Sequence, residues 1–135
     1  KYYEEALKLY ESVSDERNRA LALVSLAVLA LDFNNSADFQ RYYEESKKAY
    51  QNSSEYRELA ILDYNYSQFL ITQLKYDEAL SYSSKALEEI KQSGDKVSEG
   101  LILRGMGLAQ YLAKHPQQAM STYEKALALA EESAD

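Results

Sequence analysis

The chain has 135 residues, of which 46% are hydrophobic and 27% are charged, and its formal net charge is −7. This composition is typical of a folded domain with a sizeable core, and it excludes a disordered tail. The negative charge repels polyphosphates and anionic lipids, so we expect this segment to bind neither nucleic acid nor a membrane. Because the chain has no cysteine, a disulfide framework and a thiolate metal site are also excluded.

The first element of the chain is repeated later in the sequence. YYEEALKLY (2–10) returns as YYEESKKAY (42–50), with the same residue at 6 of 9 places. Sliding the chain by 40 residues also superposes SDERNRA (14–20), SEYRELA (54–60) and GDKVSEG (94–100) without a gap. A fixed period of this size is typical of repeat proteins. The sequence therefore predicts one repeat domain over 1–135, made of a half repeat (1–15) and three full repeats: 16–55, 56–95 and 96–135.

Each full repeat contains two helical patterns. An apolar periodicity over roughly 18 residues, which we call helix A, is followed by a polar break and a second periodicity over about 15 residues, helix B. The breaks are predicted at 33–38, 73–77 and 113–117, and Pro116 suits the first turn of a helix. Acidic residues at the joints, Asp15, Glu55 and Asp95, suit helix N-termini. No segment reads as a strand, so the predicted fold is all-α, with helical hairpins in series.

Two sets of equivalent positions predict how the helices pack. One face of helix B is expected to be buried, with large and small residues alternating along it: Tyr3, Ala6 and Tyr10; Tyr43, Ser46 and Tyr50; Ser83, Ala86 and Ile90; Tyr123, Ala126 and Ala130. Helix A carries a small residue at Ala27, Ser67 and Gly107. Small residues at these positions would allow helix B to approach closely.

These positions resemble the tetratricopeptide repeat, whose pattern has a large residue followed by Leu-Gly in helix A and small and aromatic residues in helix B. The third repeat fits best, through Leu103, Met106-Gly107, Ala119, Tyr123 and Ala126, while Gln110 departs from an aromatic position. The 40-residue period exceeds the usual 34 or so and looks like that of long-helix variants in bacterial regulators and motor-protein light chains. The resemblance implies a right-handed α-α superhelix, or solenoid, of antiparallel hairpins. A HEAT-like or armadillo-like array shares the period, but the small-residue positions favour the first interpretation.

Catalytic and metal-binding chemistry is poorly represented. The chain has one histidine, His115, in the break before Pro116, and it lacks a phosphate loop, an H-E-x-x-H motif and a nucleophile elbow. No sequence feature marks a carboxylate or second histidine as a partner of His115, so a solvent-exposed loop residue is the expected role. We therefore predict that the chain is not an enzyme and uses no metal or cofactor.

The resemblance implies that helix A lines an inner groove of the solenoid, on the side turned away from its own helix B. Most residues at the corresponding positions are apolar and suit an amphipathic helix or a peptide with hydrophobic anchors. Family members that bind chaperone tails hold a carboxylate with a Lys/Asn/Arg clamp; here only Arg104 and Asn65 have suitable chemistry. The candidate partner-binding residues are Val24, Val28, Leu31, Ile61, Tyr64, Asn65, Gln68, Ile71, Leu101, Arg104, Leu108 and Tyr111.

The segment ALALVSLAVLAL (20–31) is apolar on nearly all sides, but it is too short to cross a membrane. A helix of this kind needs cover on every side, so we expect Leu21, Val24, Val28 and Leu31 to pack against a preceding helix or another chain. The predicted function is a protein-interaction or peptide-binding scaffold, such as the sensor segment of a larger bacterial regulator; the alternative is a structural spacer or dimerisation module. The start at Lys1 without Met suggests a fragment, for which cytoplasm is the default location and the periplasm stays open.

Overall fold

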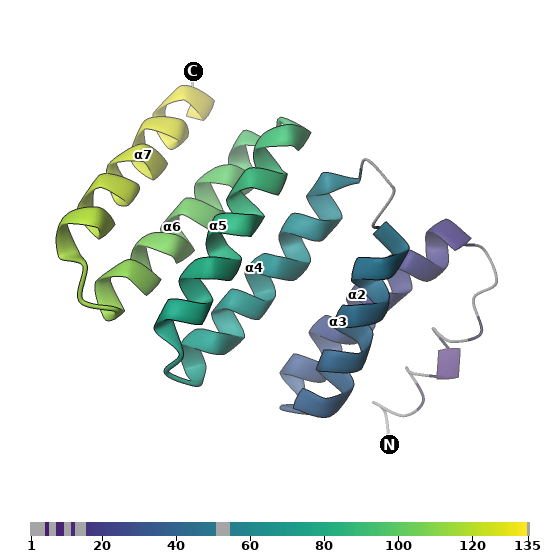
Figure 1. The fold of residues 1–135 in the computed structure, drawn as a ribbon. Coiled ribbons are helices and arrows are strands. Elements are labelled where there is room, and N and C mark those ends of the chain that lie inside the picture. The colour runs from purple at the N-terminus through teal and green to yellow at the C-terminus, as the bar shows by residue number, and fades with distance from the viewer. Residues whose placement is uncertain (1–4, 6–7, 10–11, 13–15, 51–54, 135) are drawn as a thin grey trace. The chain divides into compact units, whose positions relative to one another are not determined.

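The computed structural model describes residues 5, 8, 9, 12, 16–50 and 55–134, the outermost of them (16–18 and 134) by their backbone alone. It divides into two compact units, Lys1–Glu58 and Leu59–Asp135. Every regular element in the described part of the chain is an α-helix (Figure 1). Most of the predicted half repeat over 1–15, including Tyr3, Ala6, Tyr10 and Asp15, lies outside the described residues.

The first unit contains the hairpin of α2 (Glu16–Asp32) and α3 (Ser36–Tyr50). The small buried side chains of α2, among them Ala27 and Ala30, allow close packing with the aromatic face of α3. That face is formed by Phe39, Tyr42, Tyr43 and Tyr50, with Ser46 between them. The rings of Phe39 and Tyr43 have centroids 5.6 Å apart. The predicted buried face of helix B is therefore confirmed in this repeat.

Two more hairpins follow: α4 (Tyr56–Thr72) with α5 (Tyr76–Ser93), and α6 (Lys96–Leu112) with α7 (Pro116–Ala134). They make up the second unit, except that α4 begins just before its boundary. In Figure 1 successive helices of this unit run in alternating directions. Two clusters of buried side chains join α4, α5 and α6. Ala60, Ala86, Ile90 and Ile102 form one cluster, and Leu70, Ala79 and Ala109 form the other.

The turn inside each hairpin has the same geometry at a spacing of 40 residues. Asn34, Leu74 and Lys114 adopt positive φ values of 55°, 61° and 70°. The following amide donates to a carbonyl five residues earlier, as in Lys75 N to Leu70 O (2.9 Å) and His115 N to Gln110 O (2.8 Å). This is the Schellman arrangement, which satisfies carbonyls at a helix C-terminus. The turns span three residues (33–35, 73–75 and 113–115), so they are shorter than the predicted breaks.

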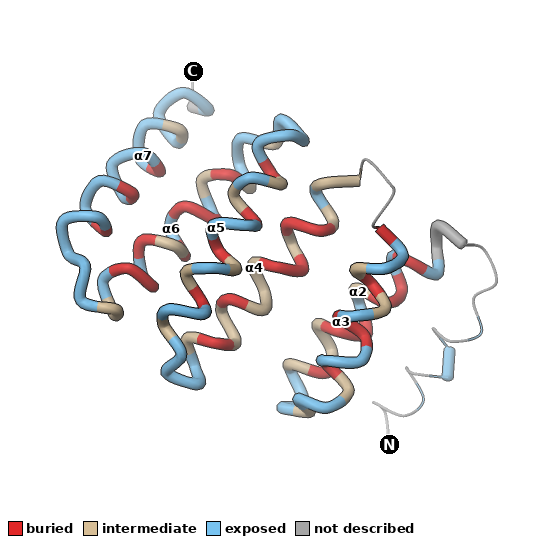
Figure 2. Tube along the Cα trace, viewed as in Figure 1, coloured by how far each residue is buried: buried red, intermediate tan, exposed pale blue. Residues whose placement is uncertain are grey.

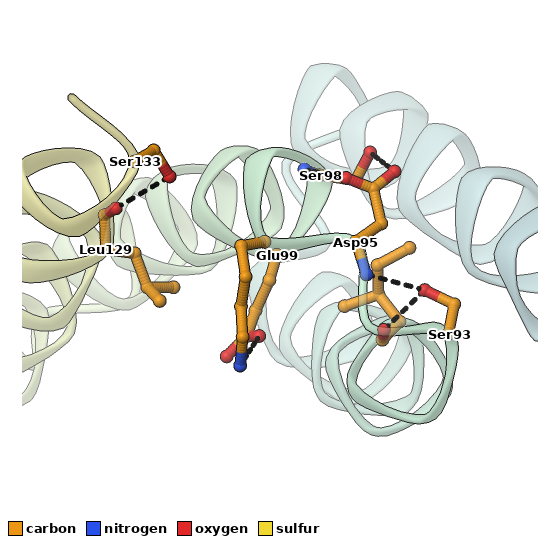
Figure 3. Close-up of polar contacts among 8 residues, drawn as sticks. Ser93, Asp95, Ser98, Glu99, Leu129 and Ser133 are labelled. Atoms are coloured by element: carbon orange, nitrogen blue, oxygen red, sulfur yellow. Dashed lines mark hydrogen bonds and ion pairs between the residues drawn. The ribbon is translucent and has the colours of Figure 1, made fainter. Parts of the chain in front are cut away.

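The start of α6 follows the predicted capping chemistry, whereas α5 begins after Lys75 without a side-chain cap. Asp95 precedes α6, and its carboxylate accepts from Ser98 N at 3.1 Å and from Ser98 Oγ at 2.7 Å. Figure 3 shows this contact and the Ser93 hydroxyl, which accepts from Asp95 N at the joint between α5 and α6. Pro116 is the first residue of α7, where its missing N–H removes no hydrogen bond.

The small-residue positions of helix A are all buried, as predicted. Ala27 and Ser67 are fully buried. A methyl group at Gly107 would lie 2.8 Å from Tyr123 Cε1, so the absence of a side chain there allows α7 to approach.

The prediction that one face of helix B is buried is wrong for part of the last repeat. Tyr123 is 40% exposed there, and Ala130 is also exposed. The cause is that no further described helix covers this side of α7, which is exposed along most of its length (Figure 2).

Candidate functional site

The predicted groove residues of α6 form an exposed strip. Leu101, Leu108 and Tyr111 are 47%, 40% and 61% exposed, and Arg104 is exposed between them. Their spacing of three and four residues places them on one side of the helix. The opposite side of α6 carries Leu103 and Gly107, which are buried. The strip is therefore an apolar surface about 15 Å long with a single positive charge.

The corresponding residues of α4 continue this surface within the second unit. Ile61, Tyr64, Asn65, Gln68 and Ile71 are all half-buried. A methyl group at Gly105 would lie 2.6 Å from Tyr64 Cε1 and 2.8 Å from Gln68 Nε2, so both α4 side chains reach α6. Because Gly105 lies next to Arg104, the structure brings the central predicted residues of α4 and α6 together.

Tyr64 is the titratable group most affected by this packing. Burial raises the pKa of its phenol, and the charge of Arg104 partly opposes that rise. The phenol is therefore neutral at physiological pH and remains a hydrogen-bond donor beside a cationic group. Gln68 Nε2, also between the two helices, is buried and has no hydrogen-bond partner among the described residues.

The predicted residues of α2 belong to the first unit. Val24, Val28 and Leu31 are half-buried, and Leu21 is 39% exposed. They lie on one side of α2, as their sequence spacing predicts. Their self-association stays a prediction.

The described residues contain no group of three or more His, Cys, Asp or Glu side chains that could hold a metal ion. His115 is exposed in the turn before α7, as predicted. Within the described ranges, no helix has the length and apolar character needed to cross a membrane.

A cleft of about 420 Å³ that was not predicted from the sequence lies on the other side of α6, between α5 and α7. Its walls include apolar residues of all three helices, and Glu99, Gln110 and Thr122 are buried polar residues that line it. In Figure 3 the Glu99 side chain extends from α6, between Leu129 on α7 and the end of α5. The sequence does contain a signal for this cleft: Tyr66 and Tyr82 of the second repeat are replaced by Met106 and Thr122 in the third.

Comparison with known proteins supports the repeat assignment. The solved crystal structure of BtubC (BKLC) from P. vanneervenii superposes with a TM-score of 0.81 and 19% sequence identity. The match covers 98% of this chain and 56% of that chain, so the present chain spans little more than half the length of BtubC. At this identity, the likeness shows the fold alone. No curated protein sequence matches the chain.

A family model described as tetratricopeptide repeat matches residues 58–132, which is more than half of the chain. The matched residues lie in the two hairpins α4–α5 and α6–α7. Repeats of this type are generally non-catalytic scaffolds for protein–protein interaction. The chain belongs to the tetratricopeptide-repeat family.

Proposed function

We propose that this chain is a non-catalytic protein-interaction module that binds a partner along the adjoining faces of α4 and α6. The observation that carries the proposal is the exposed strip of Leu101, Leu108 and Tyr111. Apolar side chains that line up over three turns on one exposed face of a helix form a contiguous patch, and such patches often mark an interaction site. The half-buried Tyr64 and Gln68 of α4 border this strip through their contacts near Gly105.

The chemistry of the strip indicates which kind of partner would fit it. Three apolar side chains at helical spacing suit an amphipathic helix or a short peptide that presents its own apolar anchors. Arg104 provides the strip with one exposed guanidinium, so a hydrogen-bond acceptor of the partner would lie opposite it. The chain's net charge of −7 disfavours a strongly acidic partner.

The test is to select peptides by display on the wild-type chain and to titrate them against substituted chains. Leu101→Ala, Arg104→Ala and Tyr111→Ala lie on the strip, and each exposed side chain can be removed without opening the core. We expect the triple variant to bind the selected peptides at least about tenfold more weakly, because interface anchors typically contribute more than 1 kcal/mol each.

The matched control is the pair Met120→Ala and Leu127→Ala, which removes side chains that are 66% and 59% exposed on α7. This pair should bind the selected peptides like the wild type. Unchanged binding by the strip variant, with its helical circular dichroism retained, would support the structural spacer instead. More specifically, we propose that the chain is the sensor segment of a larger regulator. A peptide from an adjacent regulatory domain is then the first ligand to test.

A further inference from the structure

We propose a second binding site, in the cleft between α5, α6 and α7, that accepts the side chain of a tyrosine from a partner polypeptide. The cleft has a volume of about 420 Å³, which lies in the range of small-ligand sites. It faces away from the α4–α6 surface, because its α6 residues Glu99, Leu103, Met106 and Gln110 lie on the opposite side of the helix from Leu101 and Leu108. The site therefore goes beyond the proposed function.

The second repeat shows which group belongs in this position. There, Tyr82 of α5 packs edge-to-face on Tyr66 of α4, with ring centroids 4.6 Å apart. Tyr82 also packs against the buried cluster that contains Leu70. Lys85 lies 5.4 Å from the centroid of the Tyr82 ring. An aromatic ring, an apolar base and a lysine thus form one packed unit.

The third repeat keeps the lysine beside that ring and has other side chains in place of Tyr66 and Leu70, but it lacks the ring itself. A shift of 40 residues places Thr122 at the position of Tyr82, Met106 at Tyr66 and Lys125 at Lys85, and all three line the cleft. Met106 offers a sulfur that makes favourable contacts with aromatic rings, and Lys125 can interact with the face of a ring. The first repeat also has a tyrosine at this position, Tyr42, and that side chain lines a cleft of about 230 Å³. A ring supplied from outside would therefore take the place in the third repeat that Tyr82 takes in the second.

A buried acceptor indicates that this ring carries a hydrogen-bond donor. Gln110 stands where the second repeat has Leu70, and it is only 8% exposed. Its Oε1 atom is buried and has no hydrogen-bond partner in the described part of the chain. A buried acceptor without a partner is costly, and a phenol hydroxyl could donate to it.

The charges at the cleft favour a neutral ligand group. The two lysines that line the cleft, Lys91 and Lys125, are offset by two glutamates of the same lining, Glu99 and Glu132. A phenol is neutral at physiological pH. The exposed ends of Lys91, Lys125 and Glu132 can bond to the carbonyl and amide groups that flank a tyrosine in a polypeptide, which favours a polypeptide over a free phenol.

The experiment titrates the full chain with p-cresol, 4-methylanisole and N-acetyl-tyrosinamide, with amide shifts followed by NMR. We expect shifts at the cleft residues and binding of p-cresol at least about threefold tighter than that of 4-methylanisole, which lacks the donor. Gln110→Leu should remove that preference and keep the apolar binding. We also expect N-acetyl-tyrosinamide to bind at least about threefold tighter than p-cresol, because its amides reach the charged ends of the lysines and Glu132.

Thr122→Tyr places the ring in the cleft from within the chain, so it should raise the melting temperature and abolish shifts by all three probes. Ser121→Tyr adds the same side chain at an exposed neighbouring position and should leave binding unchanged. If Thr122→Tyr fails to fold, Ala128→Phe, at an exposed position of the cleft wall, serves as the blocking variant. The site would be overturned by equal binding of p-cresol and 4-methylanisole, by a preference that survives Gln110→Leu, or by binding that survives the blocking variants. Equal affinity for p-cresol and N-acetyl-tyrosinamide would overturn the polypeptide source.

Discussion

Two buried serines on the same face of helix B differ in their hydrogen bonding. Ser46 and Ser83 are both fully buried and are separated by nearly one repeat. Ser46 Oγ donates to Tyr42 O at 2.7 Å, whereas Ser83 Oγ has no partner among the residues that the structure describes. Because an unpaired buried hydroxyl destabilises the folded state, the two serines should respond differently to the same substitution.

We expect Ser83→Ala to raise the free energy of unfolding by about 1 kcal/mol, because it removes a buried hydroxyl that has no hydrogen-bond partner among the described residues. Ser46→Ala, the matched control, should lower it by about 0.5 kcal/mol, because it removes a bond that exists. Urea unfolding followed by circular dichroism measures both values. A loss of stability in Ser83→Ala would contradict the interpretation.

The pH dependence of stability should contain a contribution from Tyr64. Burial raises the pKa of its phenol in the folded state above the ordinary value, with Arg104 opposing the rise. The folded chain therefore holds this proton more tightly than the unfolded chain does. The stability that the protonated Tyr64 phenol contributes is fully present below about pH 10, and it is lost as the pH rises through the raised pKa of the folded state.

Tyr64→Phe keeps the ring and removes the titrating group. We expect the wild type to lose more stability than Tyr64→Phe between about pH 8 and pH 11, as measured by urea unfolding at each pH. Tyr111→Phe, at a position 61% exposed, is the control for the loss of a phenol from the surface. If the free energy of unfolding fell equally with pH in the wild type and in Tyr64→Phe, the pKa of Tyr64 would be the same in the folded and unfolded states, and the prediction would be wrong.

At the scale of the element, the turns inside the hairpins combine a shared geometry with different residues. All three turn positions are left-handed, but only Asn34 is a residue that tolerates this conformation well. Leu74 and Lys114 carry side chains for which it costs about 1–2 kcal/mol. The backbone hydrogen bonds that end α4 and α6 hold them there.

Leu74→Gly should raise the free energy of unfolding by about 1 kcal/mol, because glycine adopts positive φ without strain. The Leu74 side chain is 73% exposed, so little buried surface is lost. Asn34→Gly is the control and should change stability much less, because asparagine already adopts positive φ readily. Thermal and urea unfolding measure the difference, and an equal gain at both positions would argue against relief of strain at Leu74.

The repeated elements could be predicted from the sequence because their signals are local. The 40-residue period predicted where the hairpins lie, and Pro116 and Asp95 marked helix starts that the structure confirms. The positive φ of Leu74 and Lys114 could not be predicted, because neither residue favours it. Their conformation follows from the return of helix B against helix A.

At the scale of the whole molecule, the apolar α2 segment predicts self-association. Leu21 is 39% exposed, while Val24, Val28 and Leu31 are half-buried. We expect sedimentation velocity to show a larger species as the concentration rises, and Leu21→Glu to shift it toward the monomer, because a charge cannot be buried cheaply in an apolar contact. Leu74→Glu is the exposed control. A wild type that remains monomeric at every concentration would refute this prediction.

The sequence alone determined the helical class, the repeat period and the small positions that admit a neighbouring helix, because these depend on residue spacing and size. The tertiary structure decided which of the equivalent positions are exposed to solvent. Ser83 and Tyr123 occupy the same position of the repeat, yet one is buried and the other is 40% exposed. It also revealed the cleft beside Gln110, which the lining residues from α5, α6 and α7 create together. The physical reason is that the burial of a residue depends on the helices and side chains around it. Equivalent positions have different neighbours in each repeat, so the same sequence pattern is buried in one repeat and exposed in another.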